Sequence, residues 1–350
     1  MDSLTQVVLG GAVAAAVAPA AHRRAALLAG AALGTLPDLD SLPLALLTDD
    51  PVALMTLHRG ASHSLLVLPL VGWLAWAWLR GRGGRVAQAP RRWFWAIQLA
   101  LVTHPLLDAF TVYGTQLLWP LPLHPVMWAS VFIIDPLYTL WLLLACVAAF
   151  VLRERVAAQR ALVAGLVLSS AYLGWSLAAK AMVERAAAPA LAAMGLGDAP
   201  RFSVPTPFNT LLWRVVALTP EGYVEGLRSI PADRGPMRFE AHRSEVAALD
   251  ALRGAPAVER LAWFNRGFMR AREVGGELVL SDLRMGHEPD YVFNFAVARR
   301  GAGWEPIPPR QVRLPRNAGP VRAATWRRMW GRDQAAADSG GATPADSASK

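Results

Sequence analysis

The sequence predicts a mainly α-helical membrane protein: a polytopic bundle of about six transmembrane helices, followed by a small β-rich or α+β soluble domain. Apolar residues make up 54% of the chain and its mean hydropathy is +0.30, which is high for a soluble protein. The long apolar runs lie in residues 1–180, whereas most of the acidic and basic residues lie beyond them. The chain therefore divides into a membrane-embedded part and a water-facing part.

Six apolar runs approach the roughly 20 residues that a helix needs to cross the hydrocarbon of a bilayer. They cover residues 4–21, 25–47, 62–79, 93–110, 131–152 and 161–179. The first is rich in Gly and Ala, which favours close contact between helices over exposure to lipid. The second is interrupted by Pro37, Asp38 and Asp40. Either of these two could be only half-inserted.

Basic residues gather in alternate connections, which predicts the orientation in a bacterial-type inner membrane. Residues 22–24, 80–92 and 153–160 are rich in arginine and are expected in the cytoplasm. The connections at 48–61 and 111–130 contain one arginine, Arg59, and are expected outside. The N-terminus lacks the basic start of a secretory signal, so we expect the first run to be retained. Six crossings would then place the N-terminus and residues 180–350 outside the cytoplasm.

After Lys180 the pattern changes to short alternating stretches that predict strands, at 211–216, 277–280 and 291–298, with a helix near 244–253. We therefore predict a domain at 1–180, a second at 181–330 and a disordered tail at 331–350. The basic segment 310–332, with Trp326 and Trp330, suits either a solvated tail or an anionic lipid surface. Topology explains much of the net charge of +9, so no nucleic acid partner is expected.

Ionisable residues are costly in a bilayer and usually face a partner or a cavity. His104 and Asp108 are four residues apart on a predicted helix, so their side chains share one face, as two ligands of one metal must. At the outer ends of the predicted helices, an inward-facing set could bind one or two ions of zinc, manganese or iron, with zinc preferred. The candidate ligands are Asp38, Asp40, His58, His63, His104, Asp108 and Asp135.

A bound metal lowers the pKa of water to near neutrality, so this set predicts a membrane hydrolase. We take Asp38, His63 and Asp135 as its catalytic residues. Two alternatives stay open: a non-enzymatic scaffold in which these groups and Arg59 satisfy one another, and an ion-translocating protein. The sequence contains no GxSxG, Walker, HExxH or paired CxxC motif. Its single cysteine, Cys146, cannot form an intramolecular disulfide.

The polar clusters resemble the YdjM-type family of inner-membrane metal-dependent hydrolases. The resemblance covers roughly residues 1–180 and lies in the segments MDSLT at 1–5, GTLPDLD at 34–40, HRGASHS at 58–64, HPLLD at 104–108, TVYGT at 111–115 and FIIDPLY at 132–138. It implies a membrane-embedded metal site at the same seven candidates.

A distant similarity of that family to zinc-dependent phospholipase C and P1-type nucleases implies cleavage of a phosphodiester or phospholipid, with membrane lipids as partners. The sequence departs from the family at Gln6, where many members carry His after the opening threonine. If that position binds metal, the amide oxygen of Gln6 is a weaker ligand than imidazole, and the occupancy of a second metal would change.

Overall fold

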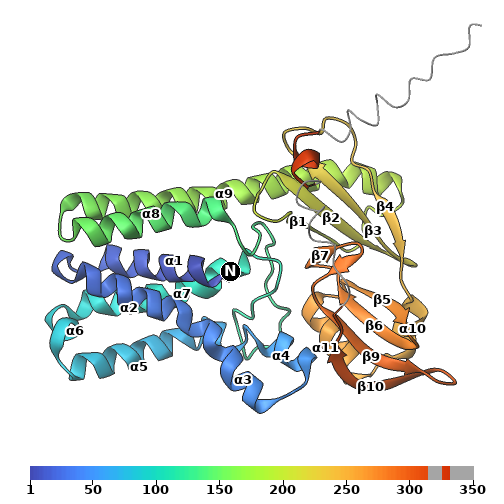
Figure 1. Ribbon diagram of the computed structural model, residues 1–350, viewed down its shortest axis with the longest axis horizontal. Helices are drawn as coiled ribbons and strands as arrows, with labels where there is room; N and C mark the ends of the chain where they lie inside the picture. Colours follow the sequence, from blue (N-terminus) through green and yellow to red (C-terminus); the bar gives the residue numbers. More distant parts are fainter. Residues whose placement is uncertain (314–324, 332–350) are drawn as a thin grey trace, which may run out of the picture.

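The computed structural model describes residues 1–313 and 325–331 of the chain. Helices form its first part, and most of them lie side by side with their axes roughly parallel (Figure 1). The α-helices of this part are α1 Ser3–Val17, α2 Arg23–Thr35, α3 Ser41–Leu47, α4 Pro51–Leu57, α5 Leu68–Gly81, α6 Gly84–Gln88, α7 Pro90–Ala109, α8 Pro136–Leu152 and α9 Val156–Ala193. Three short 3-10 turns join them, η1 Ala20–His22, η2 Leu36–Asp40 and η3 Ala61–His63.

Helix α1 forms the centre of this helical unit and packs against α2, α7, α8 and α9. Its glycines allow the closest of these approaches. A Cβ atom placed on Gly10 would collide with the backbone of Gly30 and Gly34, so the two backbones touch where α1 crosses α2. The Gly- and Ala-rich composition of the first apolar run thus serves close helix packing, as the sequence predicted.

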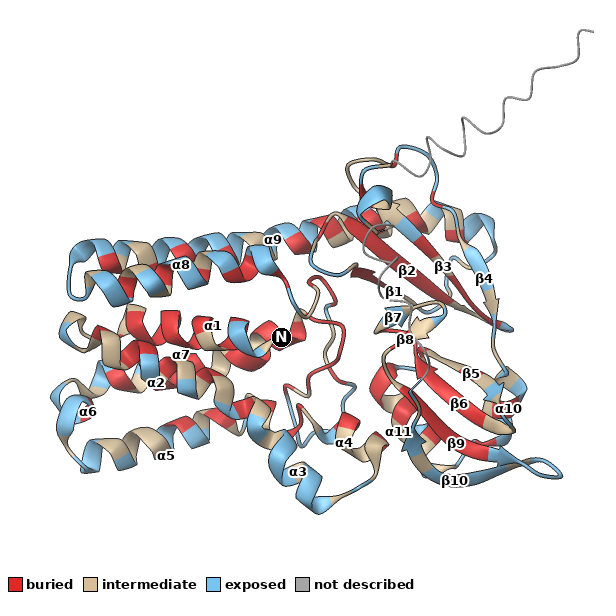
Figure 2. Ribbon diagram, viewed as in Figure 1, coloured by how far each residue is buried: buried red, intermediate tan, exposed pale blue. Residues whose placement is uncertain are grey.

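The outer faces of the helical unit remain strongly apolar. Leu144 and Val151 on α8 and Val163 and Val167 on α9 are all exposed, and Figure 2 shows the exposed positions along the outer sides of both helices. A monomeric soluble protein rarely leaves such contiguous apolar surface in water. These faces are suited to contact with lipid.

The prediction of about six transmembrane helices in a polytopic bundle is wrong. Among the described residues, one helix, α9, is long and apolar enough to cross a membrane. A second span exists only if the segment Pro51–His63 and α5, which meet at a bend of 54°, are counted as one. Helices α1 and α8 are apolar but have only 15 and 17 residues.

The prediction of six spans failed because proline and polar residues divide the apolar runs into shorter helices. Residues 25–47 form α2, η2 and α3 in succession, with Pro37 in the 3-10 turn. Residues 4–21 end their helix at Val17, before Pro19. Helix α7 has 20 residues, but it begins with arginines and carries His104 and Asp108 near its end. The apolar runs of the sequence therefore predicted longer helices than the structure contains.

The second part of the chain is a β-rich unit of two antiparallel sheets at one end of α9 (Figure 1). The first sheet has the order β1-β2-β3-β4, from Arg201–Pro205, Leu212–Thr219, Gly222–Ser229 and Glu240–Arg243. The second has the order β10-β9-β6-β5, from Trp304–Gln311, Asn294–Arg300, Glu277–Asp282 and Met269–Val274. A small hairpin joins β7 Gly286–His287 to β8 Asp290–Tyr291, and α10 Val246–Ala251 and α11 Pro256–Asn265 complete the unit.

The predicted strands at 211–216 and 277–280 are confirmed in β2 and β6, the stretch 291–298 overlaps β8 and β9, and the predicted helix near 244–253 contains α10. Strands β2, β6 and β9 are buried along most of their length, so their runs of apolar residues marked them in the sequence. Helix α9 runs without a break through the predicted domain boundary at residue 180. The predicted disordered tail lies, apart from Gly331, outside the described residues, as does much of the basic segment 310–332.

The β-rich unit packs directly on the loops beside the helices. Tyr113, which follows α7, stacks edge-on against Phe264 of α11 and Phe293, and its hydroxyl donates to the carbonyl of Met55. Arg260 of α11 donates to the hydroxyl of Thr56 on α4. These contacts hold the β-rich unit against the same end of the helices that carries the polar motifs of residues 34–64 and 104–115.

Candidate metal centre

Four of the predicted ligands meet at one point from three separate elements. Asp38 lies on η2, His63 ends η3, and His104 and Asp108 occupy the last two turns of α7. One ligand atom from each residue can be chosen so that all four lie within 4.8 Å of one another. The side chains of His63, His104 and Asp108 are fully buried, and that of Asp38 is 21% exposed. The helical spacing of His104 and Asp108 thus places both on the face that the sequence predicted.

Five of the six distances between these atoms fit the edges of a tetrahedron. The Nε2 atoms of His63 and His104 are 3.1 Å apart. Each lies 3.2–3.5 Å from Oδ1 of Asp38 and from Oδ2 of Asp108. Ligands bound tetrahedrally at zinc distances of about 2.0–2.1 Å would be about 3.3–3.4 Å apart. The site therefore has the dimensions of a four-coordinate centre with two nitrogen and two oxygen ligands.

Among the described residues, the same atoms have no partner outside the cluster apart from Arg59, which lies beside Asp108. Asp38 Oδ1 and Asp108 Oδ2 are buried without a hydrogen-bond partner. The Nδ1 atom of His104 lies 2.6 Å from the carbonyl oxygen of Gly34, which can only accept, so Nδ1 carries a proton and, in the neutral ring, Nε2 presents its lone pair. Buried acceptors that face one another are unfavourable unless a cation or a proton lies between them. The residues present therefore fit a divalent metal ion.

Three donor groups surround the carboxylate of Asp108. The amino group of Met1 donates to its Oδ1, and the side-chain amide of Gln6 donates to the same oxygen at 3.1 Å. The Nε atom of Arg59 is 3.3 Å from Oδ2. Burial alone would raise the pKa of the Asp108 carboxyl, but the charges of Arg59 and the amino group, together with the interactions with His104 and His63, outweigh burial and hold that pKa well below its ordinary value. Asp108 is consequently ionised, as a metal ligand must be.

Arg59 reaches this position through an uncommon backbone conformation. Its φ of +62° lies in the left-handed region, where side chains other than glycine are rare. The buried guanidinium also donates to the hydroxyl of Thr111 and lies over the ring of Tyr113 at 4.9 Å. A strained residue held by several contacts is typical of functional sites. Arg59 thus connects the cluster to the loop on which the β-rich unit rests.

Asp40 and His58, also predicted as ligands, pair with each other beside the four-residue cluster. Oδ1 of Asp40 is 2.7 Å from Nδ1 of His58, and its Oδ2 accepts from the hydroxyl of Ser62 at 2.5 Å. The ring of His58 stacks edge-on against that of His63. Burial would raise the pKa of the Asp40 carboxyl, but the hydrogen bonds from His58 and Ser62 and the charge interactions with His58 and His63 together outweigh burial and lower that pKa.

Asp135, the remaining predicted ligand, lies outside the four-residue group. It precedes α8 and caps that helix, with Oδ1 accepting from the backbone amides of Leu137 and Tyr138. Its Oδ2 accepts from the hydroxyl of Tyr172 on α9 at 2.9 Å. Oδ1 therefore stabilises the N-terminus of α8, and Oδ2 links that end of α8 to α9.

The structure adds contacts of two residues near the cluster, Ser62 and Gln6. Ser62 stands within the HRGASHS segment and carried little signal, because a serine between two histidines resembles an ordinary turn residue. Gln6, the departure from the family pattern, lies against Asp108 and the carbonyl of His104, and its Oε1 is buried without a partner. Only the neighbours brought together by the fold reveal either contact.

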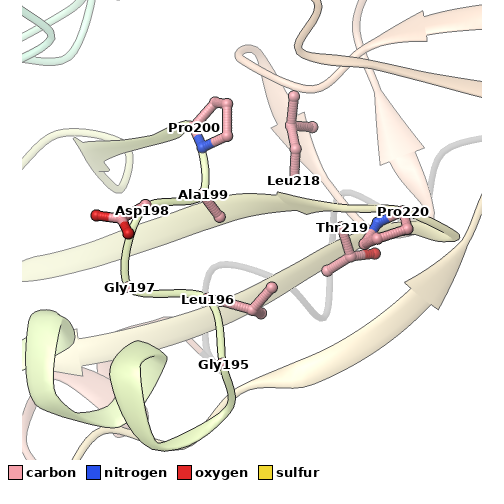
Figure 3. A pocket seen from close by; sticks show the side chains of 9 residues that line it. All are labelled: Gly195, Leu196, Gly197, Asp198, Ala199, Pro200, Leu218, Thr219 and Pro220. Carbon is pink, nitrogen blue, oxygen red and sulfur yellow. The ribbon is translucent and has the colours of Figure 1, made fainter.

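A separate surface hollow lies in the β-rich unit, between the end of α9 and the turn that joins β2 to β3 (Figure 3). Asp198 is the ionisable side chain among the nine residues that line it. The hollow has none of the clustered ligands of the helical unit, and we assign it no chemistry.

The fold and the site together define a helical membrane-associated unit with a buried His/Asp cluster, followed by a β-rich unit. The profile of the YdjM inner membrane protein family matches residues 1–183, and the chain belongs to that family. This confirms the resemblance drawn from the sequence motifs and the inner membrane as the family's location. No curated protein and no solved structure matches the chain.

Proposed function

We propose that this chain is a metal-dependent hydrolase of the inner membrane, with Asp38, His63, His104 and Asp108 as the ligands of one divalent ion, zinc in preference to manganese or iron. The single observation that supports it best is the set of unpartnered buried acceptors spaced at tetrahedral ligand distances. A metal held there would supply a water molecule whose pKa is near neutrality. His63 and His104 contribute neutral nitrogen donors, which suit zinc.

Water and substrate would enter on the side of Asp38. This carboxylate is partly exposed, whereas the other three ligand side chains are fully buried. Catalytic zinc sites usually keep three protein ligands and one exchangeable position. Asp38 is the ligand best placed to yield that position and to accept a proton from the attacking water. Its predicted catalytic role and that of His63 remain part of this proposal, whereas Asp135 is placed to stabilise a helix junction.

A phosphodiester or phospholipid is the substrate that the surroundings favour. Arg59 adds a buried positive charge beside the cluster, which would stabilise an anionic group on the substrate. Helix α3, which follows Asp38 and Asp40, buries none of its residues and exposes Leu42, Leu46 and Leu47. Such a helix next to the site is suited to lie among the acyl chains of membrane lipids.

The orientation we propose places the β-rich unit on the outer side of the inner membrane. The connections between α1 and α2 and between α8 and α9, together with α6, lie at the end of the helices away from the β-sheets (Figure 1). These segments carry the arginine clusters at 22–24, 153–160 and 80–92. Short basic connections are retained in the cytoplasm. The metal cluster, at the opposite end, would then face outward.

A second function is supported by one observation. Four protein ligands complete a tetrahedral shell, and structural zinc sites are closed in this way. The ion would then hold η2, η3 and α7 together in a non-enzymatic scaffold. A hydrolysis assay distinguishes the two functions, because a closed structural site binds metal without turnover.

The test is to purify the full chain in detergent, load it with zinc, and assay it with an activated phosphodiester and with phospholipid in mixed micelles. The hydrolase predicts turnover that chelation removes and zinc restores, and that Asp38→Ala abolishes. Stoichiometric zinc with no turnover of either class would favour the scaffold. Absence of zinc from the folded protein would contradict both.

A further inference from the structure

We propose that Ser62 and Asp40 are positioning residues for the metal centre: Asp40 orients the Ser62 hydroxyl, and Ser62 in turn fixes the tautomer and the ring orientation of His63. This inference rests on the proposed metal site and deepens it. The sequence predicted that Asp40 binds the metal directly. In this proposal Asp40 acts through Ser62, and Ser62 acts on His63.

The first step is the direction of the hydrogen bond between Ser62 and Asp40. The hydroxyl oxygen of Ser62 is 2.5 Å from Oδ2 of Asp40. The same Oδ2 accepts from the backbone amide of Arg59 at 3.2 Å, a contact in which the amide can only donate. Oδ2 of Asp40 is thus an acceptor in both contacts. The hydroxyl proton of Ser62 therefore points at Asp40.

The second step follows from the single proton of a hydroxyl group. Because Ser62 donates that proton to Asp40, its oxygen can only accept from Nδ1 of His63, which lies 2.9 Å away. Nδ1 of His63 must then carry the ring proton. In a neutral imidazole this leaves the lone pair on Nε2, the atom that faces Asp38, Asp108 and His104.

The third step concerns the contacts that hold the Asp40 side chain in place. Asp40 is itself held by His58 at 2.7 Å and by the backbone amide of Arg59 at 3.2 Å. Each bond restricts the rotation of the Asp40 side chain, which is 12% exposed. The orientation of Ser62 is therefore set before a metal arrives, at little cost in side-chain entropy.

The two histidine ligands are thus oriented by different devices. The Nδ1 proton of His104 is held by the backbone carbonyl of Gly34, which no side-chain substitution removes directly. That of His63 depends on the side chains of Ser62 and Asp40. Groups that hold the distal nitrogen of a metal-binding histidine typically affect metal affinity by roughly 10–100-fold.

Ser64 provides a matched control. It is a serine one residue after His63, and it is completely buried. Its hydroxyl donates to the carbonyl of Trp119 at 2.7 Å and makes no contact with a ligand of the cluster. Substitution of Ser64 therefore tests the general effect of losing a buried serine hydroxyl in the same segment.

The experiment measures zinc affinity by competition with a chelator in the full-length, detergent-purified chain. We expect Ser62→Ala to weaken zinc binding by roughly 10–100-fold and Ser62→Thr to keep affinity near that of the wild type, because threonine retains the hydroxyl. Ser64→Ala should leave the affinity within about threefold. Asp40→Ala should reproduce the loss, and Ser62→Ala with Asp40→Ala should lose no more than either alone, since both act through His63.

Cobalt(II) substitution adds a spectroscopic reading that a general loss of stability would not produce. The visible spectrum should change in the Ser62→Ala protein, since one nitrogen ligand is reoriented, and should be unchanged in the Ser64→Ala protein. Equal losses for Ser62→Ala and Ser64→Ala, or additive losses for Ser62→Ala and Asp40→Ala, would overturn the proposal. If Ser62→Ala does not fold, Asp40→Asn with the Ser62→Thr protein makes the same comparison.

The result also separates this proposal from the proposed function. Wild-type protein that binds zinc, with a Ser62→Ala variant of equal affinity, would overturn the positioning role and leave the metal centre standing. Wild-type protein that binds no zinc would overturn both.

Discussion

The Nε2 atoms of His63 and His104 lie 3.1 Å apart although the two residues are on different elements and 41 positions apart in the chain. Each Nδ1 atom is occupied by another partner, Ser62 for His63 and the carbonyl of Gly34 for His104. The two rings therefore direct lone pairs at each other, an arrangement that is unfavourable unless a shared cation lies between them. Oδ1 of Asp38 and Oδ2 of Asp108 complete the set.

The first prediction concerns two of the ligands on α7. His104→Ala and Asp108→Ala should each remove most of the bound metal, since each removes one of four ligands. His242→Ala is the control, because His242 lies in β4 of the other unit, with Glu225 as its neighbour. Elemental analysis of the three purified variants checks this prediction. Similar small losses in all three would indicate a structural hydrogen-bonded cluster.

The second prediction distinguishes Asp135 from the four clustered residues. Asp135→Ala should lower the free energy of unfolding by about 1–2 kcal/mol, because it removes the N-terminal cap of α8 and the acceptor of the Tyr172 hydroxyl. The metal content should stay unchanged. Chemical denaturation and metal analysis of the same preparation give both values, and a loss of metal from the folded variant would restore Asp135 to the ligand set.

The third prediction follows from the close crossing of α1 and α2. Gly34→Ala places a Cβ atom against the backbone of Gln6, so the helices must separate, at a cost of about 1–3 kcal/mol. Because the carbonyl of Gly34 holds His104, the metal affinity should fall as well. Gly174→Ala on α9 is the control, since a Cβ atom there meets no atom within 4 Å. Thermal unfolding with and without zinc measures both effects, and equal behaviour of the two variants would contradict the account.

The fourth prediction is the sign of the pH dependence of metal binding. Burial lowers the pKa of His104, but its hydrogen bonds and charge interactions with Asp108 and Asp38 outweigh burial and raise that pKa above its ordinary value of 6.5. A proton on His104 must leave before a metal binds, so the affinity should rise with pH until the raised pKa is passed. Below it, the affinity should fall by up to about tenfold for each pH unit per proton displaced. Zinc competition at several pH values checks this, and an affinity that fell as the pH rose would be inconsistent with it.

The sequence identified four residues that the fold brings together, whereas its helix count was wrong. The spacing of His104 and Asp108 placed both on one helix face, and the cost of ionisable residues in apolar runs singled out Asp38 and His63 as well. Helical periodicity gives the direction of a side chain but not the partner that reaches it from another element. The separation of Asp135 from the cluster and the role of Ser62 could therefore only follow from the fold.

The helix count failed for a related reason. Hydropathy averages over a window, so it joined α2 to α3 across Pro37 and treated residues 62–79 as one helix, although η3 and α5 are separated by a bend. Short strands in the β-rich unit were located correctly, because their buried apolar stretches are only a few residues long and are separated by Gly- and Pro-bearing connections.

The existence of the metal site is tested first by elemental analysis of the detergent-purified wild-type chain beside a His63→Ala, His104→Ala, Asp108→Ala triple variant, after loosely bound metal has been removed. We expect close to one divalent ion per wild-type chain, and none in a variant that is still folded by circular dichroism. A metal-free wild type that zinc cannot reconstitute, or a triple variant with an undiminished metal content, would contradict it.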